Sequence, residues 1–319
     1  MPFPRTSLAI LLAMAAHPAT QAYAQQIPVP AATAVPVRSD GLVATWYPPL
    51  SGKRGPVILA LGGSEGGEGG SKALARALAP HGYGVLALAY FNADGLPQAV
   101  QEIPLEYFDR ALTWIASQPL ADVKHIGIYG ISVGGETALV VAARHPEIRA
   151  VVAAVPTSVV WQGFNPADYR SIKSTYSLNG VGVPYVPYDN NAAFTGILDL
   201  YQRSLKGIAA HPDAIIPVEK IGGPILLLSA KDDKMWPSTL MSDQVIARLD
   251  SNRFKYAHTH IAYADAGHGA MSPPDGRPPS ADGAFDNFGG TAAGNAAART
   301  DMWARVLAFF DAALRPAKR

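Results

Sequence analysis

Cysteine is absent from this chain of 319 residues. Without a thiol, the chain has no cysteine nucleophile, no disulfide and no cysteine-ligated metal. Folding is still expected, because a chain of this length that is 49% hydrophobic can bury a sizeable core. Acidic and basic side chains nearly balance, giving a formal net charge of +1. This balance provides no electrostatic basis for binding nucleic acid or an acidic membrane surface.

The sequence also lacks an apolar run long enough to cross a membrane. Its N-terminus instead has the parts of a secretion signal. Arg5 supplies the positive start, Leu8 to Ala16 the apolar stretch, and Ala22-Tyr23-Ala24 a small-x-small cleavage site. We therefore expect residues 1–24 to be a signal peptide, so that the mature chain begins near Gln25 and is secreted or periplasmic.

Apolar strands alternate with amphipathic helices along the rest of the chain. Residues 25–40 are rich in Pro and Ala and are expected to be a linker, and residues 41–319 to form one catalytic domain. Strands are expected at about 43–47, 56–61, 84–89, 123–129, 150–155, 224–229 and 260–263, and helices at about 71–79, 104–117, 136–144 and 300–313. This alternation predicts an α/β fold with a mainly parallel sheet and helices on both faces.

Residues 161–220 interrupt this alternation. The segment is rich in aromatic residues and carries several Pro and Gly. It lies between two expected sheet strands, where an inserted cap could cover the carboxyl ends of the strands. The alternative is a peripheral excursion in which the aromatic side chains only pack.

The pentapeptide Gly130-Ile131-Ser132-Val133-Gly134 carries the chemistry. A β-branched strand precedes it, and a helix that ends before Pro146 follows it. A serine on such a turn projects its hydroxyl, and the two glycines leave room for the neighbouring strand and helix. The start of the helix directs free N–H groups and a positive dipole end at the same place. We expect Ser132 to be a nucleophile, with a structural glycine turn as the alternative.

A serine nucleophile needs a base and an orienting carboxylate, which lie downstream in the α/β-hydrolase order. His268 is the expected base, because it follows a strand in a flexible loop. Asp233 is the favoured acid over Asp232, since Pro237 follows it by four residues in a loop that leaves the strand at 224–229 and starts a helix near Ser238. The other downstream histidines considered are His211, His258 and His260. The last two share one face of a strand, but no third ligand is near in sequence, so a plain strand face is favoured over a metal site.

A glycine-rich loop, residues 62–70, follows the expected strand at 56–61. In this architecture the loop supplies the second oxyanion donor. We expect the backbone N–H groups of Val133 and of Ser64 or Gly63 to stabilise the oxyanion. The alternative, a phosphate-binding loop, lacks the Gly-Lys-Ser/Thr ending.

Several longer stretches resemble one family over residues 41–314. They are Gly62 to Gly67, Leu88 to Asn92, Leu105 to Phe108, Gly130 to Glu136, Ile216 to Ile221, Asp232 to Trp236 and Ala266 to His268. The chain resembles the C-terminal catalytic domain of the acyl-CoA thioester hydrolase and bile-acid-CoA:amino-acid N-acyltransferase family, which belongs to the α/β-hydrolase superfamily. The resemblance implies Ser132 as nucleophile, Asp233 as acid and His268 as base. Members that transfer the acyl group to an amino acid typically use cysteine, so the serine favours water as acceptor.

Together these features predict a secreted serine hydrolase that cleaves carboxylic esters or thioesters of small molecules through an acyl-enzyme, without a cofactor. The alternatives are an acyltransferase, an acyl-CoA thioesterase, an amidase or peptidase, and a non-catalytic binding protein. Export would separate the chain from cytoplasmic CoA thioesters, and the cations of residues 161–220 are scattered in the sequence. We therefore expect uncharged esters to be hydrolysed at least as well as the matching acyl-CoA.

Overall fold

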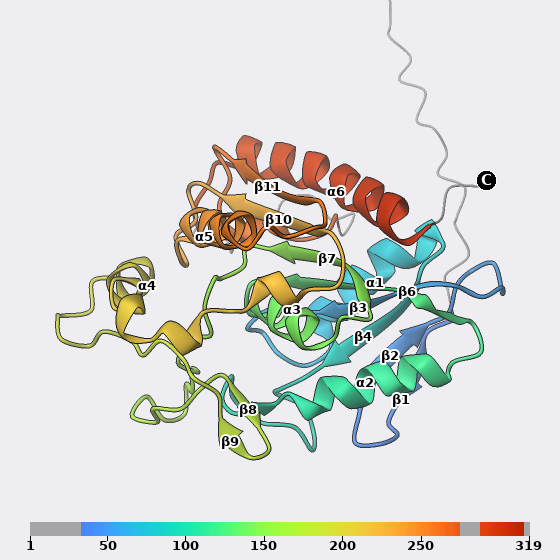
Figure 1. Cartoon of the computed structure of the whole chain (residues 1–319), viewed down its shortest axis with the longest axis horizontal. Helices are drawn as coiled ribbons and strands as arrows, with labels where there is room; N and C mark the ends of the chain where they lie inside the picture. The colour runs from blue at the N-terminus through green and yellow to red at the C-terminus, as the bar shows by residue number, and fades with distance from the viewer. Residues whose placement is uncertain (1–32, 275–287, 316–319) are drawn as a thin grey trace, which may run out of the picture.

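A mainly parallel, eight-stranded sheet forms the centre of the molecule in the computed structural model, which describes residues 33–274 and 288–315 (Figure 1). The strands lie in the order β1-β2-β4-β3-β6-β7-β10-β11. Their bounds are β1 Val35–Val37, β2 Val43–Tyr47, β3 Gly55–Leu61, β4 Gly84–Ala89, β6 Ala121–Ile131, β7 Ile148–Ala154, β10 Ile225–Ala230 and β11 His258–Tyr263. The β1–β2 and β2–β4 pairs are antiparallel and the other pairs are parallel. This sheet confirms the predicted fold class.

Helices cover both faces of the sheet, so β4 and β10 are buried along their whole length. Helices α1 (Gly69–Leu78) and α6 (Ala292–Leu314) pack on one face, and α2 (Glu106–Ser117), α3 (Val133–Arg144) and α5 (Ser238–Ser251) on the other. Successive residues of a strand point to opposite faces. Ile58 therefore belongs to the core under α1 and α6, and Leu59 to the core under α2 and α3.

Two predicted element bounds are wrong. Val35–Val37 falls in the predicted linker 25–40, but it forms β1 on the edge of the sheet and pairs with Ala44–Trp46. The strand is only three residues long and contains a proline, so the sequence gives little sign of it. The last helix begins at Ala292 rather than near Thr300, because the Thr291 side chain accepts a hydrogen bond from Gly294 N. The predicted signal peptide, residues 1–24, lies outside the described residues.

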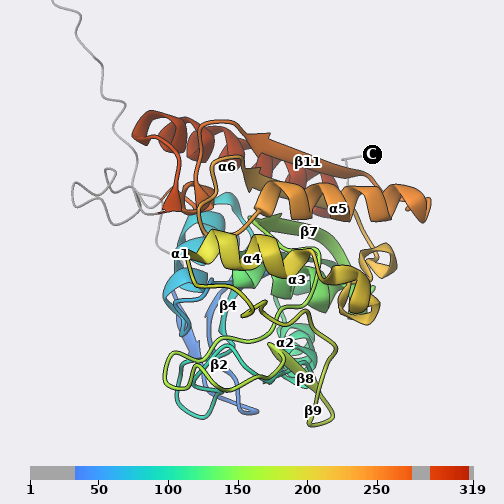
Figure 2. The same ribbon diagram turned by 90° about the vertical axis from the view of Figure 1, so that its left-hand side faces the viewer.

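An excursion leaves the sheet between β7 and β10 and includes the predicted cap, residues 161–220. It contains β8 (Tyr176–Leu178), β9 (Val181–Gly182), α4 (Ile197–Leu205) and the 3-10 helices η2 (Ile208–Ala210), η3 (Pro212–Ala214) and η4 (Val218–Lys220). Strand β8 pairs with β5 (Ile103–Pro104), which anchors the excursion beside α2. Figure 1 shows α4 to the left of the sheet, and Figure 2 shows α4 in front of α3. Within the described ranges, no helix combines the length and apolarity that a membrane crossing requires.

Candidate active site

Ser132 lies on a strained turn between β6 and α3. Its backbone has φ 58° and ψ −123°, a conformation that non-glycine residues rarely adopt. The turn is held because Ser132 N donates to Ala154 O at 2.9 Å. A Cβ on Gly130 would lie 1.8 Å from Gly134 O, and a Cβ on Gly134 would lie 2.3 Å from Gly62 O. The two glycines of the pentapeptide are therefore needed for the close approach of strand, helix and loop.

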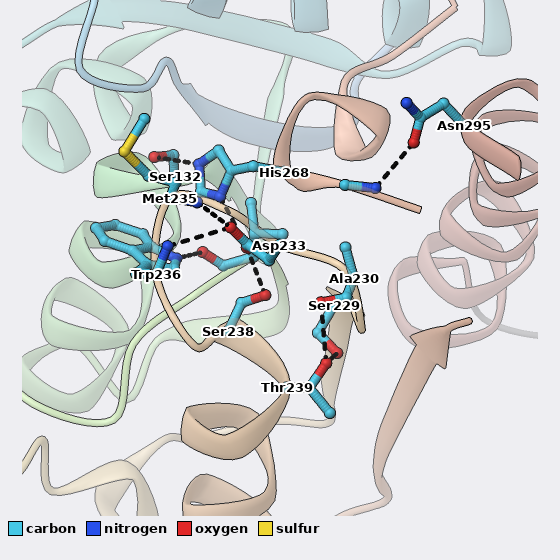
Figure 3. A network of polar contacts seen from close by, with 12 residues as sticks. Ser132, Ser229, Ala230, Asp233, Met235, Trp236, Ser238, Thr239, His268 and Asn295 are labelled. Carbon is cyan, nitrogen blue, oxygen red and sulfur yellow. Dashed lines mark hydrogen bonds and ion pairs between the residues drawn. The ribbon is translucent and has the colours of Figure 1, made fainter. Parts of the chain in front are cut away.

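The three side chains selected from the sequence form one hydrogen-bonded chain (Figure 3). His268 Nε2 lies 2.9 Å from Ser132 Oγ, and His268 Nδ1 lies 2.9 Å from Asp233 Oδ2. The histidine begins the 3-10 helix η5 (His268–Met271) in the loop after β11. Asn295 at the start of α6 holds that loop by accepting from Gly267 N at 2.8 Å. This geometry permits proton transfer from the serine to an imidazole that a carboxylate orients.

The Asp233 carboxylate is buried, with 5% of the residue exposed, and is fully hydrogen-bonded. Its Oδ1 accepts from Met235 N at 2.9 Å and Trp236 N at 3.2 Å. Its Oδ2 accepts from Ser238 Oγ at 2.6 Å as well as contacting His268. Asp232 points elsewhere, because its carboxylate accepts from Gly290 N at 2.8 Å and pairs with Lys234. The structure thus brings Asp233, and not Asp232, to the histidine.

Each of the other downstream histidines lies away from Ser132. His258 and His260 face α5, where each is paired with an aspartate. His211 ends η2 in the excursion. Among the described residues, no group of three or more His, Asp or Glu side chains is placed to hold a metal ion.

The glycine-rich loop lies against the serine. A Cβ on Gly63 would be 3.4 Å from the Ser132 Cβ, and Gly63 N donates to Glu65 Oε1 at 3.0 Å. Ser64 is exposed, and Val133 is the first residue of α3. Of the three predicted donors, Gly63 is the one whose N–H is engaged by Glu65. The N–H of Val133 lies in the first turn of α3, where it has no partner within the helix.

Glu136 is a buried acid to which the sequence analysis assigned no role. It lies four residues after Ser132 on α3 and is 2% exposed. Burial raises the pKa of Glu136 to about 8, although the hydrogen bond from Trp161 N and the nearby hydroxyl groups of Thr157 and Tyr176 oppose the shift. Because Trp161 N donates to it, the Glu136 carboxyl connects α3 to the beginning of the excursion. The available signal was a glutamate in the first turn of a helix that is mostly apolar.

An aromatic cluster connects the excursion to the histidine. Trp161 packs edge-on against Tyr201, Tyr201 against Trp236, and Trp236 against His268, with ring centroids 4.9 to 5.4 Å apart. Val133 and Met235 pack against the same cluster. Figure 3 shows Met235 and Trp236 beside the pair of Ser132 and His268. The side chains packed behind His268 are thus apolar and aromatic, and part of this cluster comes from the excursion.

A sequence profile of the family described as BAAT / Acyl-CoA thioester hydrolase C terminal matches residues 103–316. Acyl-coenzyme A thioesterase 2, mitochondrial, of Mus musculus is 31% identical over 289 residues, which cover 88% of this chain and 60% of that protein. Acyl-coenzyme A thioesterase 6 of Mus musculus is 31% identical over 294 residues, which cover 88% of this chain and 65% of that protein. The chain thus matches less than two thirds of the length of these relatives.

Solved structures support the fold. An α/β hydrolase from Penicillium sp. sh18 superposes with a TM-score of 0.51 at 17% identity, over 88% of this chain and 97% of that one. A puromycin-hydrolyzing peptidase of Mycobacterium tuberculosis superposes with a TM-score of 0.55 at 16% identity, over 86% of this chain and 38% of that one. The resemblance drawn from the sequence is confirmed: the chain has an α/β-hydrolase fold and belongs to the BAAT / acyl-CoA thioester hydrolase C-terminal family.

Proposed function

We propose that this chain is a serine hydrolase of acyl thioesters and esters. The observation that carries the proposal is the hydrogen-bonded chain from Ser132 through His268 to Asp233, on a turn that exposes the serine. Ser132 Oγ attacks the acyl carbonyl while His268 takes its proton. His268 then returns the proton to the leaving thiolate or alkoxide, and Asp233 stabilises the imidazolium. Water, activated by the same histidine, releases the acid from the acyl-enzyme and restores the serine.

The oxyanion of the tetrahedral intermediate is assigned to the N–H groups of Val133 and Ser64. Val133 supports this role because it starts α3, where the helix dipole adds to the N–H donor. Ser64 is chosen over Gly63 because the Gly63 N–H already donates to Glu65. Loss of one such donor typically costs about 2.7–4 kcal/mol in transition-state stabilisation.

The substrate is proposed to be a small acyl compound with an apolar acyl group, which suits the aromatic cluster beside His268. The names of the relatives support thioesters, and in particular acyl-CoA. Within the excursion, Lys173 pairs with Glu102, and Arg203 with Asp199. Arg203 and Lys206 do line one cavity of about 440 Å³, yet Arg203 also donates to backbone oxygens there. Because two of the five cations of residues 161–220 are already paired with carboxylates, and the five are scattered in the sequence, we keep the proposal that uncharged esters react at least as well as CoA thioesters.

The test compares an acyl-CoA with an uncharged ester of equal chain length, on the wild-type chain and on Ser132→Ala. We expect turnover of both by the wild type, no acyl transfer to added alcohol or amine, and almost no turnover by Ser132→Ala. Full turnover by Ser132→Ala would overturn the nucleophile, and no turnover of any acyl compound would favour a binding protein. A preference for the CoA thioester of about a hundredfold, roughly 2.7 kcal/mol, would overturn the ester preference alone.

Export is also proposed, on the basis of the sequence of residues 1–24. Fractionation of bacterial cells that express the full chain, followed by mass measurement of its N-terminus, tests this. A periplasmic or secreted chain beginning near Gln25 is expected, and a cytoplasmic chain that keeps residues 1–24 would contradict the proposal.

A further inference from the structure

A second serine–histidine–aspartate network lies between β10, β11 and α5. Ser229 Oγ on β10 lies 2.6 Å from His260 Nε2 on β11, and His260 Nδ1 lies 2.8 Å from Asp243 Oδ1 on α5. Thr239, the second residue of α5, extends the network: its Oγ1 lies 2.9 Å from Ser229 Oγ and donates to Ala230 O at 3.1 Å. The network therefore joins two strands of the sheet to the beginning of one helix.

This second network has no access for a substrate. Ser229 is fully buried within β10, and its hydroxyl is enclosed between Thr239 and His260. Nothing in its position resembles the turn at Ser132, since Ser229 is a regular strand residue paired with Ala262. A serine in this position cannot reach an acyl carbonyl.

The Asp243 carboxylate can only accept, so it fixes the donor at one end of the network. Thr239 has a single hydroxyl hydrogen, which it gives to the Ala230 carbonyl. Nε2 of a neutral imidazole then accepts from the Ser229 hydroxyl, whose Oγ also lies 2.9 Å from Thr239 Oγ1. The Asp243 carboxylate accepts from Nδ1–H at the other side of the ring. Every buried hydroxyl is thereby satisfied, which fixes the first turn of α5 to the carboxyl end of β10.

The first turn of α5 also holds the Asp233 carboxylate. Ser238 immediately precedes Thr239, and its hydroxyl donates to Asp233 Oδ2, the same oxygen that contacts His268 Nδ1 (Figure 3). Ser238 is fully buried, so no water can replace this bond easily. The position of Asp233 thus depends on where α5 begins.

We propose that Ser229, Thr239 and His260 are positioning residues for the hydrolytic site, which act by anchoring the start of α5 so that Ser238 holds the Asp233 carboxylate against His268. The inference rests on the proposed function, because it requires His268 to be the base. These three residues do not touch the substrate; they set the position of the Asp233 carboxylate.

The experiment measures ester hydrolysis by Thr239→Val, Thr239→Ser, His260→Leu and His258→Leu, with rates expressed per reactive serine after titration with a phosphonate ester. Thr239→Val removes the hydroxyl and keeps the shape, and Thr239→Ser restores the hydroxyl. His258→Leu is the matched control, because His258 lies on the same strand and pairs with Asp250 on α5 at 2.9 Å but does not contact Ser229.

We expect Thr239→Val and His260→Leu to lower kcat roughly tenfold with KM within about twofold of wild type, since small misplacements of catalytic groups act on the transition state. Thr239→Ser and His258→Leu should stay near wild type. Weakening the bond from Ser238 also leaves more charge on Asp233 Oδ2, so the midpoint of the rising limb of kcat/KM against pH should move to higher pH. A purely structural role would reduce the number of reactive serines without moving this midpoint.

The proposal is overturned if Thr239→Val and His260→Leu keep the wild-type kcat and midpoint per reactive serine. It is equally overturned if His258→Leu falls as far as His260→Leu, because the effect would then be general to the edge of the sheet. Failure of the proposed function has a different signature: Ser132→Ala would keep turning over the ester.

Discussion

The two serine–histidine–aspartate networks of this chain have almost the same internal distances. In the first, the serine–histidine and histidine–aspartate distances are both 2.9 Å, and in the second they are 2.6 and 2.8 Å. Their surroundings differ in the exposure of the acid and in the backbone that carries the serine. The Asp233 side chain is 2% exposed, whereas the Asp243 side chain is 65% exposed. Ser132 lies on a strained turn, and Ser229 lies in a regular strand.

The difference shows that three correctly spaced side chains do not make an active site. A nucleophile also needs a backbone that presents its hydroxyl, N–H donors for the oxyanion, and an acid shielded from solvent. By the assignment proposed above, the network of Ser132 combines these features and that of Ser229 does not. In the second network the same residue types satisfy buried polar groups and fasten a helix to a sheet.

The largest expected effect separates the two serines. Ser132→Ala should lose nearly all turnover, by up to about 10⁶-fold, because the nucleophile is gone while the turn is kept by its glycines. Ser229→Ala should retain turnover within roughly a hundredfold of wild type, since it only weakens the anchoring of α5. Steady-state kinetics on a chromogenic ester measure both. A Ser132→Ala variant with more than about a tenth of the wild-type kcat would contradict the assignment.

The second largest effect should separate the aspartates of the two networks, Asp233 and Asp243. Asp233→Asn should lower kcat by as much as about 10⁴-fold, because an amide cannot stabilise the imidazolium. Asp243→Asn should cost far less, since its carboxylate is exposed and lies outside the site. Asp232→Asn serves as a third comparison and should be nearly neutral. If Asp232→Asn or Asp243→Asn proved as damaging as Asp233→Asn with the fold intact, the acid would have to be reassigned.

The next comparison is between a glycine of the turn at Ser132 and a glycine with open space around it. A Cβ on Gly130 would meet Gly134 O at 1.8 Å, so Gly130→Ala should lower the free energy of unfolding by several kcal/mol, about the cost of forced overpacking. The control is Gly69→Ala, where nothing lies within 4 Å of the added methyl group. Urea unfolding of both variants measures the difference. Equal stability would mean that the turn tolerates a Cβ and that its glycines are not required.

Glu136 gives an effect that is absent at acidic pH and grows as the pH rises. Its folded pKa, about 8, is higher than that of an unfolded glutamate, so the folded state binds the proton more tightly. Its contribution is therefore fully present below about pH 4.5 and is lost as the pH rises towards 8, by about 1.4 kcal/mol per pH unit. Glu136→Gln cannot titrate, so its melting temperature should gain on wild type between pH 5 and pH 8, values that span this window. A constant difference across that range would contradict a buried, protonated Glu136.

Much of the fold could be predicted because the central strands are almost entirely apolar, as β4 and β10 show. The turn at Ser132 was predictable because its two glycines have a steric cause. Strand β1 and the small sheet of β5, β8 and β9 could not be predicted, since they are two or three residues long and exist through their pairing partners.

The three side chains of the site were predictable from the sequence, but the residues that hold them in place were not. Asp233 and His268 follow strands that end at the same edge of the sheet, so their approach to Ser132 follows from the topology. Ser238 and Thr239 carry no such signal, because they look like ordinary residues at a helix start. The sequence predicts only a plain strand face for His260, since its pairing with α5 exists only in three dimensions.

Covalent labelling tests the central comparison most directly. The wild-type chain is treated with a fluorophosphonate, which reacts with activated serine hydroxyls, and the modified peptide is identified by mass spectrometry. We expect one label on Ser132 and none on Ser229, and no label at all on Ser132→Ala. A label on Ser229, or a wild-type chain that stays unlabelled while it hydrolyses esters, would contradict the account.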